Sequence, residues 1–244
     1  MKPTGALWLA LAAMASAQSP LPPPAATFHH MHLNDESSQW VAFYERLFDA
    51  REIERFRLWS LDALRTGDVL LLTSRSTATP GPGDSAVWHY GWGVTSLHET
   101  YLAHNVREVV WEPPLPAHQF HLHLESMTPN AAAAWYRDRL GAEAEFGNGS
   151  EGTVDRDMRR PRALVRFGDV TMLFYKVEMP LVSTRGKLVD HLAFSVPNLD
   201  ALLAQAAETG IIVLEPRRAL GGGTVAMIEG PDQLAIELLE AVRR

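Results

Sequence analysis

The sequence FHLHLES at residues 120–126 sets His121 and His123 in alternation with Leu122 and Leu124. A period of two is typical of a β-strand whose faces have different surroundings, because successive side chains point to opposite sides. The leucines are therefore expected to pack on helices. The histidines are expected to face whatever the sheet encloses.

Four segments of the chain open in this way, with a histidine followed two to three residues later by a large apolar residue. They begin at His30, His89, His121 and His191. Helix-spaced stretches follow the first and third, QWVAFYERLFDA at 39–50 and NAAAAWYRDRLGA at 130–142, and apolar strands come later at 67–73 and 168–174. The pattern predicts a unit of strand, helix and strands that occurs four times.

The second unit is shorter than the others. Residues 89–113 match residues 191–216, and both stretches end in Glu-Pro. Only the fourth unit continues into a hairpin, over 221–240, so the second copy is expected to lack two strands.

The ends and linkers of the chain define its expected domains. Residues 1–17 have the single positive charge, the short apolar stretch and the small residues of a secretory signal peptide, and residues 18–27 read as a flexible leader. Runs rich in proline and glycine at 77–85 and 112–116 are expected to act as linkers. They give an amino-terminal half at 28–113 and a carboxy-terminal half at 118–242. The protein is thus expected to be exported to the periplasm or the medium, with no membrane span after cleavage.

Composition limits the chemistry. The chain has 244 residues, of which 46% are hydrophobic and 21% charged, as in an ordinary folded protein. Its formal net charge of −7 makes nucleic acid an unsuitable partner. Because there is no cysteine, thiol nucleophiles and thiolate zinc sites are excluded, and any metal must be bound through nitrogen and oxygen.

A carboxylate near the chain end shares the face of the histidines. In LAIELLE at 234–240, Ile236 and Leu238 alternate with Glu237, which is therefore expected on the concave side of the sheet if the apolar pair packs on helices. A carboxylate there is costly to desolvate unless it is paired or bound to a metal. Two imidazoles and one carboxylate form a set that suits ferrous iron, zinc or manganese and leaves positions open for substrate.

At this point the sequence resembles the vicinal oxygen chelate superfamily, which includes glyoxalases, extradiol dioxygenases and bleomycin-resistance proteins. The resemblance is carried by the histidines that open the units, by FYERLFDA and WYRDRLGA, and by EGPDQLAIELLE. It implies an α+β fold in which tandem βαβββ modules pair into cup-shaped mixed sheets with helices outside, the second module being truncated.

The resemblance also implies a metal site in the carboxy-terminal half, which would hold a complete module pair. Carried over residue by residue, His121, His191 and Glu237 would bind one divalent ion, Fe²⁺, Mn²⁺ or Zn²⁺. The strand GDVTMLFYKV offers no central carboxylate for the fourth ligand of glyoxalases, so a three-ligand centre is expected. The amino-terminal half, with His30 and His89, would be a degenerate partner.

Other residues have weaker signals. His123 is the first candidate for proton transfer, and a hydrogen-bonded histidine of the inner face is the alternative. His32 is interpreted as such an inner-face histidine. Tyr175 and Arg166 are candidates for positioning a phenolic or anionic substrate, and structural roles are open for both.

These expectations combine into two hypotheses. The first is an exported metal-dependent enzyme, of the dioxygenase, glyoxalase or lyase type, that acts on a small substrate with vicinal oxygens. The alternative is a metal-free protein of the bleomycin-resistance type that sequesters a small molecule. In either case the chain would act as a monomer or a homodimer.

Overall fold

The computed structural model describes residues 25–34, 42, 53–67, 69–74, 85–92, 119–147 and 161–241. The predicted signal peptide, most of the leader, nearly all of the first helix and of both linkers, and most of the second module lie outside these residues. Among the helices described, none has the length and apolar character needed to cross a membrane.

The described elements follow one another along the chain in repeated groups. The amino-terminal half contributes β1 (Thr27–Asn34), β2 (Ile53–Leu58), β3 (Leu61–Thr66), β4 (Val69–Ser74) and β5 (Val87–Trp92). The third group is β6 (Phe120–Ser126), α3 (Pro129–Leu140), β7 (Glu143–Phe146), β8 (Ala163–Phe167) and β9 (Val170–Lys176). The fourth is β10 (Val189–Ser195), α4 (Leu199–Thr209), β11 (Val213–Leu220), β12 (Gly223–Glu229), the 3₁₀ turn η1 (Pro231–Gln233) and β13 (Ala235–Ala241).

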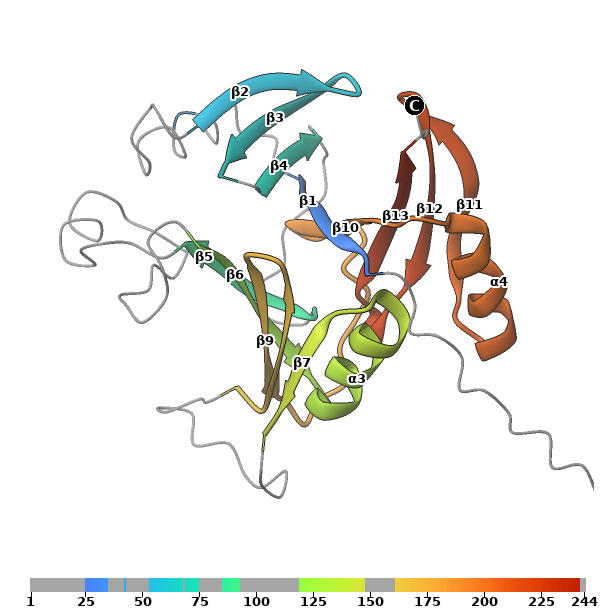
Figure 1. The fold of residues 1–244 in the computed structure, drawn as a ribbon. Coiled ribbons are helices and arrows are strands. Elements are labelled where there is room, and N and C mark those ends of the chain that lie inside the picture. The colour runs from blue at the N-terminus through green and yellow to red at the C-terminus, as the bar shows by residue number, and fades with distance from the viewer. Residues whose placement is uncertain are drawn as a thin grey trace, which may run out of the picture.

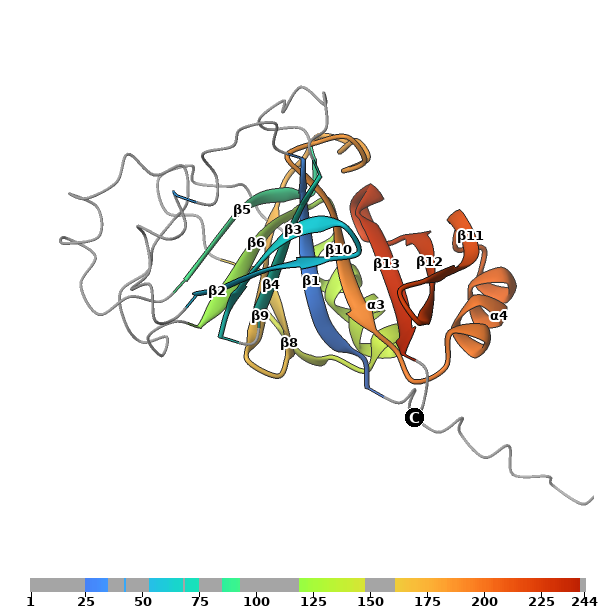
Figure 2. The ribbon, with the colours of Figure 1, turned by 90° about the horizontal axis from the view of Figure 1, so that it is seen from above.

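The strands form two sheets (Figures 1 and 2). One has eight strands in the order β11-β12-β13-β10-β1-β4-β3-β2, and the other has five in the order β5-β6-β9-β8-β7. Within a group, the first strand runs parallel to the last, as in β1 with β4, β6 with β9, and β10 with β13. This mixed α+β arrangement of repeated modules confirms the fold class expected from the sequence.

The modules pair in an order that differs from the sequence-based expectation. Antiparallel pairing of β1 with β10 joins the first module to the fourth, and antiparallel pairing of β5 with β6 joins the second to the third. The third and fourth modules do not share a sheet. Strands that follow one another along the chain tend to become neighbours, which accounts for the β5–β6 pair and leaves β1 and β10 to pair with each other.

The apolar faces of both sheets meet in one continuous core. Leu122 of β6 and Leu192 of β10 belong to the same buried cluster. Phe194 joins the sheets, because its ring lies 4.7 Å from that of Phe167 and 5.6 Å from that of Phe28. The side chains one residue away on each strand, including the histidines, therefore point away from this shared core.

The two described helices pack against the apolar faces of the sheets, on the side opposite to the concave faces. α3 is proline-initiated and ends at Gly141, whose φ of 72° is a left-handed conformation that glycine adopts at low cost. α4 begins at Asn198, whose side chain accepts a hydrogen bond of 2.8 Å from the backbone N–H of Ala201. Ala133 and Tyr136 of α3 and Leu199 of α4 belong to the buried core.

Candidate metal centre

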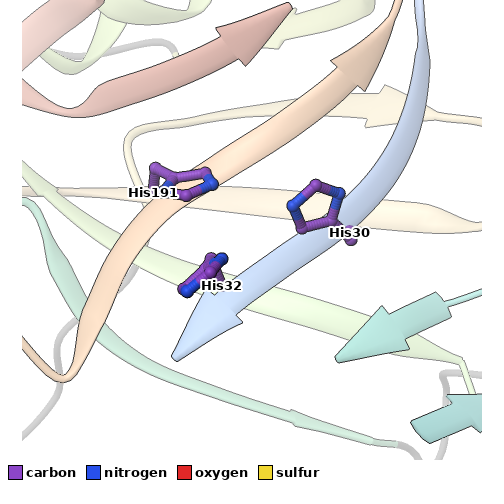
Figure 3. Close-up of side chains that lie close together, drawn as sticks. All are labelled: His30, His32 and His191. Carbon is purple, nitrogen blue, oxygen red and sulfur yellow. The ribbon is translucent and has the colours of Figure 1, made fainter. Parts of the chain in front are cut away.

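Three imidazoles lie together on the concave face of the eight-stranded sheet. His30 and His32 come from β1, and His191 comes from β10, directly opposite His32 in the strand register. Each offers a ring nitrogen, and these three atoms lie within 4.8 Å of one another. Figure 3 shows the rings gathered in one space beside the two strands. The pairing of the first and fourth modules thus brings together residues about 160 positions apart in sequence.

A carboxylate faces the same space from β13. Glu237 lies opposite Ala193 in the register of β10 with β13, two residues beyond His191. Its Oε2 atom is 3.6 Å from Nε2 of His30 and 3.8 Å from Nε2 of His191. Glu237 is only 4% exposed, so its charge must be balanced from within the protein.

The outer nitrogens of two of these rings are held by hydrogen bonds. Nδ1 of His191 lies 2.7 Å from Oδ1 of Asp190, and this nitrogen carries the proton because an ionised carboxylate only accepts. Nδ1 of His30 shares a hydrogen bond of 2.9 Å with Nδ1 of His29. The Nε2 atom of His191 is buried and has no hydrogen-bond partner among the described residues. This is the arrangement that orients a metal-binding histidine.

Alternating charges link His191 to Glu237 around the wall of the site. Asp190 pairs with Arg185, which pairs with Glu215 at 2.8 Å. Arg218 lies 3.7 Å from Glu215 and 3.7 Å from Oε1 of Glu237. Together with the hydrogen bond from His191 to Asp190, these contacts brace both sides of the centre.

The protonation of the site favours ligand atoms with free lone pairs. Burial, together with the neighbouring His191, lowers the pKa of His32 to about 4. Burial and the adjacent histidines also hold the pKa of His30 well below its usual value. His30 and His32 are therefore neutral at pH 7, as metal coordination requires.

The pKa values of the carboxyl groups of Glu237 and Asp190 are shifted in opposite directions. Burial raises the pKa of Glu237, against the lowering effect of His191 and Arg218. Burial also opposes ionisation of Asp190, but hydrogen bonds from His191 and Gly186, together with the nearby charges, hold its pKa below the ordinary value. Asp190 is therefore a permanent anion that can fix the proton on Nδ1 of His191.

The centre opens into a cavity of about 680 Å³. This volume suits a small organic molecule. Its lining combines apolar side chains with amide, hydroxyl and guanidinium groups. Besides the centre and its charged neighbours, the cavity is lined by Asn34, Trp59, Leu61, Leu72, Ser74, Gly186, Leu220 and Met227.

The structure brings together two of the three sequence-predicted ligands. His191 and Glu237 lie side by side, whereas His121 is on β6 of the five-stranded sheet. Because Leu122 and Leu192 both enter the shared core, the imidazoles of His121 and His191 point away from each other. The expected set His121, His191 and Glu237 is therefore corrected: in the described structure, His30 occupies the place given to His121.

The other predicted residues also lie on the five-stranded sheet. His123 stacks on Tyr175 with ring centroids 5.0 Å apart, and it lies 4.0 Å from the ring of His89. Arg166 on β8 pairs with Glu145 on the neighbouring strand. The proton-transfer and substrate-positioning candidates thus gather away from His191 and Glu237.

Sequence reasoning assigned His30 to a degenerate half and His32 to the inner face alone. The signal that could have found both was their spacing of two residues, which puts them on the same face of one strand. What the spacing did not show was which strand would lie beside β1. That neighbour decides which third histidine completes the cluster.

A cup of paired modules, with imidazoles and a carboxylate on its concave face, is the arrangement of the vicinal oxygen chelate class. The family model of the Glyoxalase/Bleomycin resistance protein/Dioxygenase superfamily matches residues 118–238. The carboxy-terminal half of the chain therefore belongs to this superfamily.

Solved structures agree with the fold over most of the chain. Glyoxalase I from Zea mays is 10% identical, with a TM-score of 0.58 over 88% of this chain and 92% of that one. A V278E mutant of the same enzyme gives 11% identity and a TM-score of 0.59 over the same shares. No curated protein sequence matches the chain significantly. At this identity the likeness shows the fold alone.

Proposed function

We propose that the chain is an exported metal-dependent enzyme that binds one divalent cation through His30, His191 and Glu237, with His32 as a third imidazole. Its substrate is a small molecule with vicinal oxygens. The observation that carries the proposal is the convergence of these side chains, from β1, β10 and β13, in the lining of one cavity.

The donor set fits Fe²⁺, Mn²⁺ or Zn²⁺. Nε2 of His30 and Nε2 of His191 are buried, and neither has a hydrogen-bond partner within the described residues. Their distances to Glu237 exceed the range of a hydrogen bond, so the three groups do not satisfy one another. A buried carboxylate that receives no hydrogen bond from the imidazoles it faces is costly, and a divalent cation removes that cost.

The chain's own groups then have separate roles. A divalent cation bound here supplies Lewis acidity toward the substrate oxygens. Asp190 keeps the proton on Nδ1 of His191 and so directs the Nε2 lone pair to the centre. Arg218 holds one oxygen of Glu237 and leaves Oε2 turned toward the two histidines. Leu61 and Leu72, from β3 and β4, and Met227, from β12, add apolar side chains to the cavity on both sides of the centre.

Export is part of the proposal. It is supported by the signal-like sequence at residues 1–17. Expression of the full chain in a secreting bacterium should yield a mature protein that begins at Gln18. Mass spectrometry of the cell-free fraction measures this, and retention of the full-length chain in the cytoplasm contradicts export.

Metal analysis of the mature protein, purified without oxygen or chelators, tests the centre. The wild-type chain should carry about one divalent ion, and Glu237→Ala should carry about a tenth of that or less. Glu143→Ala, which removes an exposed carboxylate from β7, is the matched control and should retain the metal. A metal-free wild-type protein that still binds small molecules would favour the sequestering alternative.

A further inference from the structure

We propose that Trp59 is a specificity-determining residue that limits the length of the substrate. It does so by separating the cavity of the metal centre from a second cavity on the same concave face. This inference rests on the proposed function, since it concerns the substrate held at that centre.

The second cavity is the continuation of the first along the strands. Its volume is about 420 Å³, and Leu239, Val225 and Ser195 are among its lining residues. Leu239 is two residues beyond Glu237 on β13, and Val225 lies opposite Leu239 in the register with β12. Side chains two residues apart share a face and are about 7 Å apart. The two cavities are therefore successive compartments of one trough.

Two side chains line both compartments and divide them. Trp59, in the turn between β2 and β3, and Leu220, at the end of β11, are the residues that the two linings share. Trp59 and Leu220 also pack against one cluster of buried residues formed by Ala193, Val225 and Leu239. Ala193 is fully buried in this cluster, so Trp59 and Leu220 cover the strand between the two compartments.

The indole of Trp59 is held in place from three sides. It stacks on His29 at 5.9 Å with an interplanar angle of 14°, and it meets the ring of His30 edge-on at 5.8 Å. Nε1 of the indole lies 2.0 Å from where a Cβ on Gly221 would stand, so only glycine permits this approach. Trp59 thus bridges the β2–β3 turn and the β11–β12 turn, which belong to opposite edges of the eight-stranded sheet.

The turn that carries Trp59 adopts a costly conformation. Trp59 and Ser60 both have positive φ, 52° and 69°. A hairpin turn of this kind favours asparagine or glycine at these positions, and other residues cost of order 1 kcal/mol or more there. Strain of this kind concentrates at functional sites, where the surrounding structure maintains it.

The second compartment suits an uncharged, mainly apolar group. Leu220, Val225 and Leu239 form one side of it, and Ser195 and Thr224 contribute hydroxyls. An oxygen of Glu240, its carboxylate, accepts a hydrogen bond of 2.8 Å from the N–H of Leu199 at the start of α4. No lysine or arginine is among the described lining residues. An alkyl or aryl substituent therefore fits better than an anionic one.

Binding of catechol and 4-hexylcatechol to the zinc-loaded protein tests the partition by calorimetry. Both probes present vicinal oxygens, and only the second has an apolar tail. The wild-type protein should bind them with affinities within about threefold, because Trp59 keeps the tail in solvent. Trp59→Ala should bind 4-hexylcatechol at least about tenfold more tightly than catechol, since each buried methylene contributes roughly fourfold.

Three further variants serve as controls for the role of Trp59. Trp59→Phe retains a ring at the partition and should behave like the wild type. In the Trp59→Ala background, Ser195→Phe fills the second compartment and should abolish the gain. Trp88→Ala removes a tryptophan that is 44% exposed on the five-stranded sheet and should change neither affinity.

The outcomes separate the two proposals. If catechol binds but Trp59→Ala leaves the preference between the probes unchanged, the role of Trp59 is overturned and the metal centre stands. A wild-type protein that already prefers 4-hexylcatechol tenfold also overturns it. If zinc-loaded protein binds neither probe, the proposed function fails together with this inference.

Discussion

The two sheets present histidines in the same way but differ at one position of their last strands. In the eight-stranded sheet, Glu237 lies beside the first strand of its module, two residues beyond His191. At the corresponding place in the five-stranded sheet, Leu173 lies two residues beyond His121. One sheet therefore adds a carboxylate to its imidazoles, and the other adds an apolar side chain.

The surroundings of the imidazoles differ as well. His191 is fixed by Asp190, whereas both ring nitrogens of His123 are buried without a hydrogen-bond partner among the described residues. Burial lowers the pKa of His123 to about 2 and that of His121 to about 4. Strand alternation thus decides which face a histidine occupies. Binding of a cation also needs an anionic partner and a group that orients the ring.

The largest expected difference between the two sheets is in the effect of histidine substitutions on metal binding. His30→Ala should weaken zinc binding by about 100-fold or more, because it removes a ligand at the carboxylate. His121→Ala should leave zinc affinity within about threefold of the wild type. Competition with a chromophoric chelator measures both. The reverse result would restore the sequence-based ligand set.

Removal of the orienting carboxylate should have the next largest effect. Asp190→Asn keeps the shape of the side chain but loses the charge that fixes the proton on Nδ1 of His191, so zinc affinity should fall by about 10- to 100-fold. Asp169→Asn, in the exposed turn between β8 and β9, is the control. Equal affinities for the wild type and Asp190→Asn would show that the hydrogen bond has no role in binding.

Acid should destabilise the metal-free protein through the histidines of the five-stranded sheet. His123 keeps its neutral form when folded, whereas an unfolded histidine binds a proton below about pH 6.5. Its contribution to stability is therefore complete above pH 6.5 and is lost as the pH falls toward 2. Between pH 7 and pH 5, the unfolding free energy of the wild type should fall by up to about 2 kcal/mol more than that of His123→Gln.

Urea unfolding at the two pH values, in the presence of a chelator, measures that difference. Tyr175→Phe is the control because burial raises the pKa of Tyr175 to about 12, outside this range. Parallel pH profiles for the wild type and His123→Gln would mean that His123 has the same pKa in the folded and unfolded states.

The smallest effect is expected at Arg166. Its ion pair with Glu145 is exposed, and such pairs contribute little to stability. Arg166→Ala should change the unfolding free energy by less than about 1 kcal/mol and leave catechol affinity at the zinc-loaded centre unaltered. Urea unfolding and calorimetry check this. A clear loss of catechol affinity would return Arg166 to the substrate site.

The sequence predicted which face of each strand is buried, but not which strands lie side by side. The alternation around His191 and Glu237 placed both on the concave side, and the structure brings them together. The same alternation placed His121 on a concave face, but of another sheet. Local periodicity reports which side of a strand is buried. The partner of an unpaired edge depends on how the remaining modules pack, which no single segment encodes.

Pairing of β1 with β10 gives the centre an unusual dependence on chain connectivity. A fragment that starts near residue 118 spans the region matched by the family model but lacks His30 and His32. Such a fragment should not bind zinc when it is expressed by itself. Mixing it with a separately produced amino-terminal fragment would restore the missing imidazoles if β1 of one fragment pairs with β10 of the other.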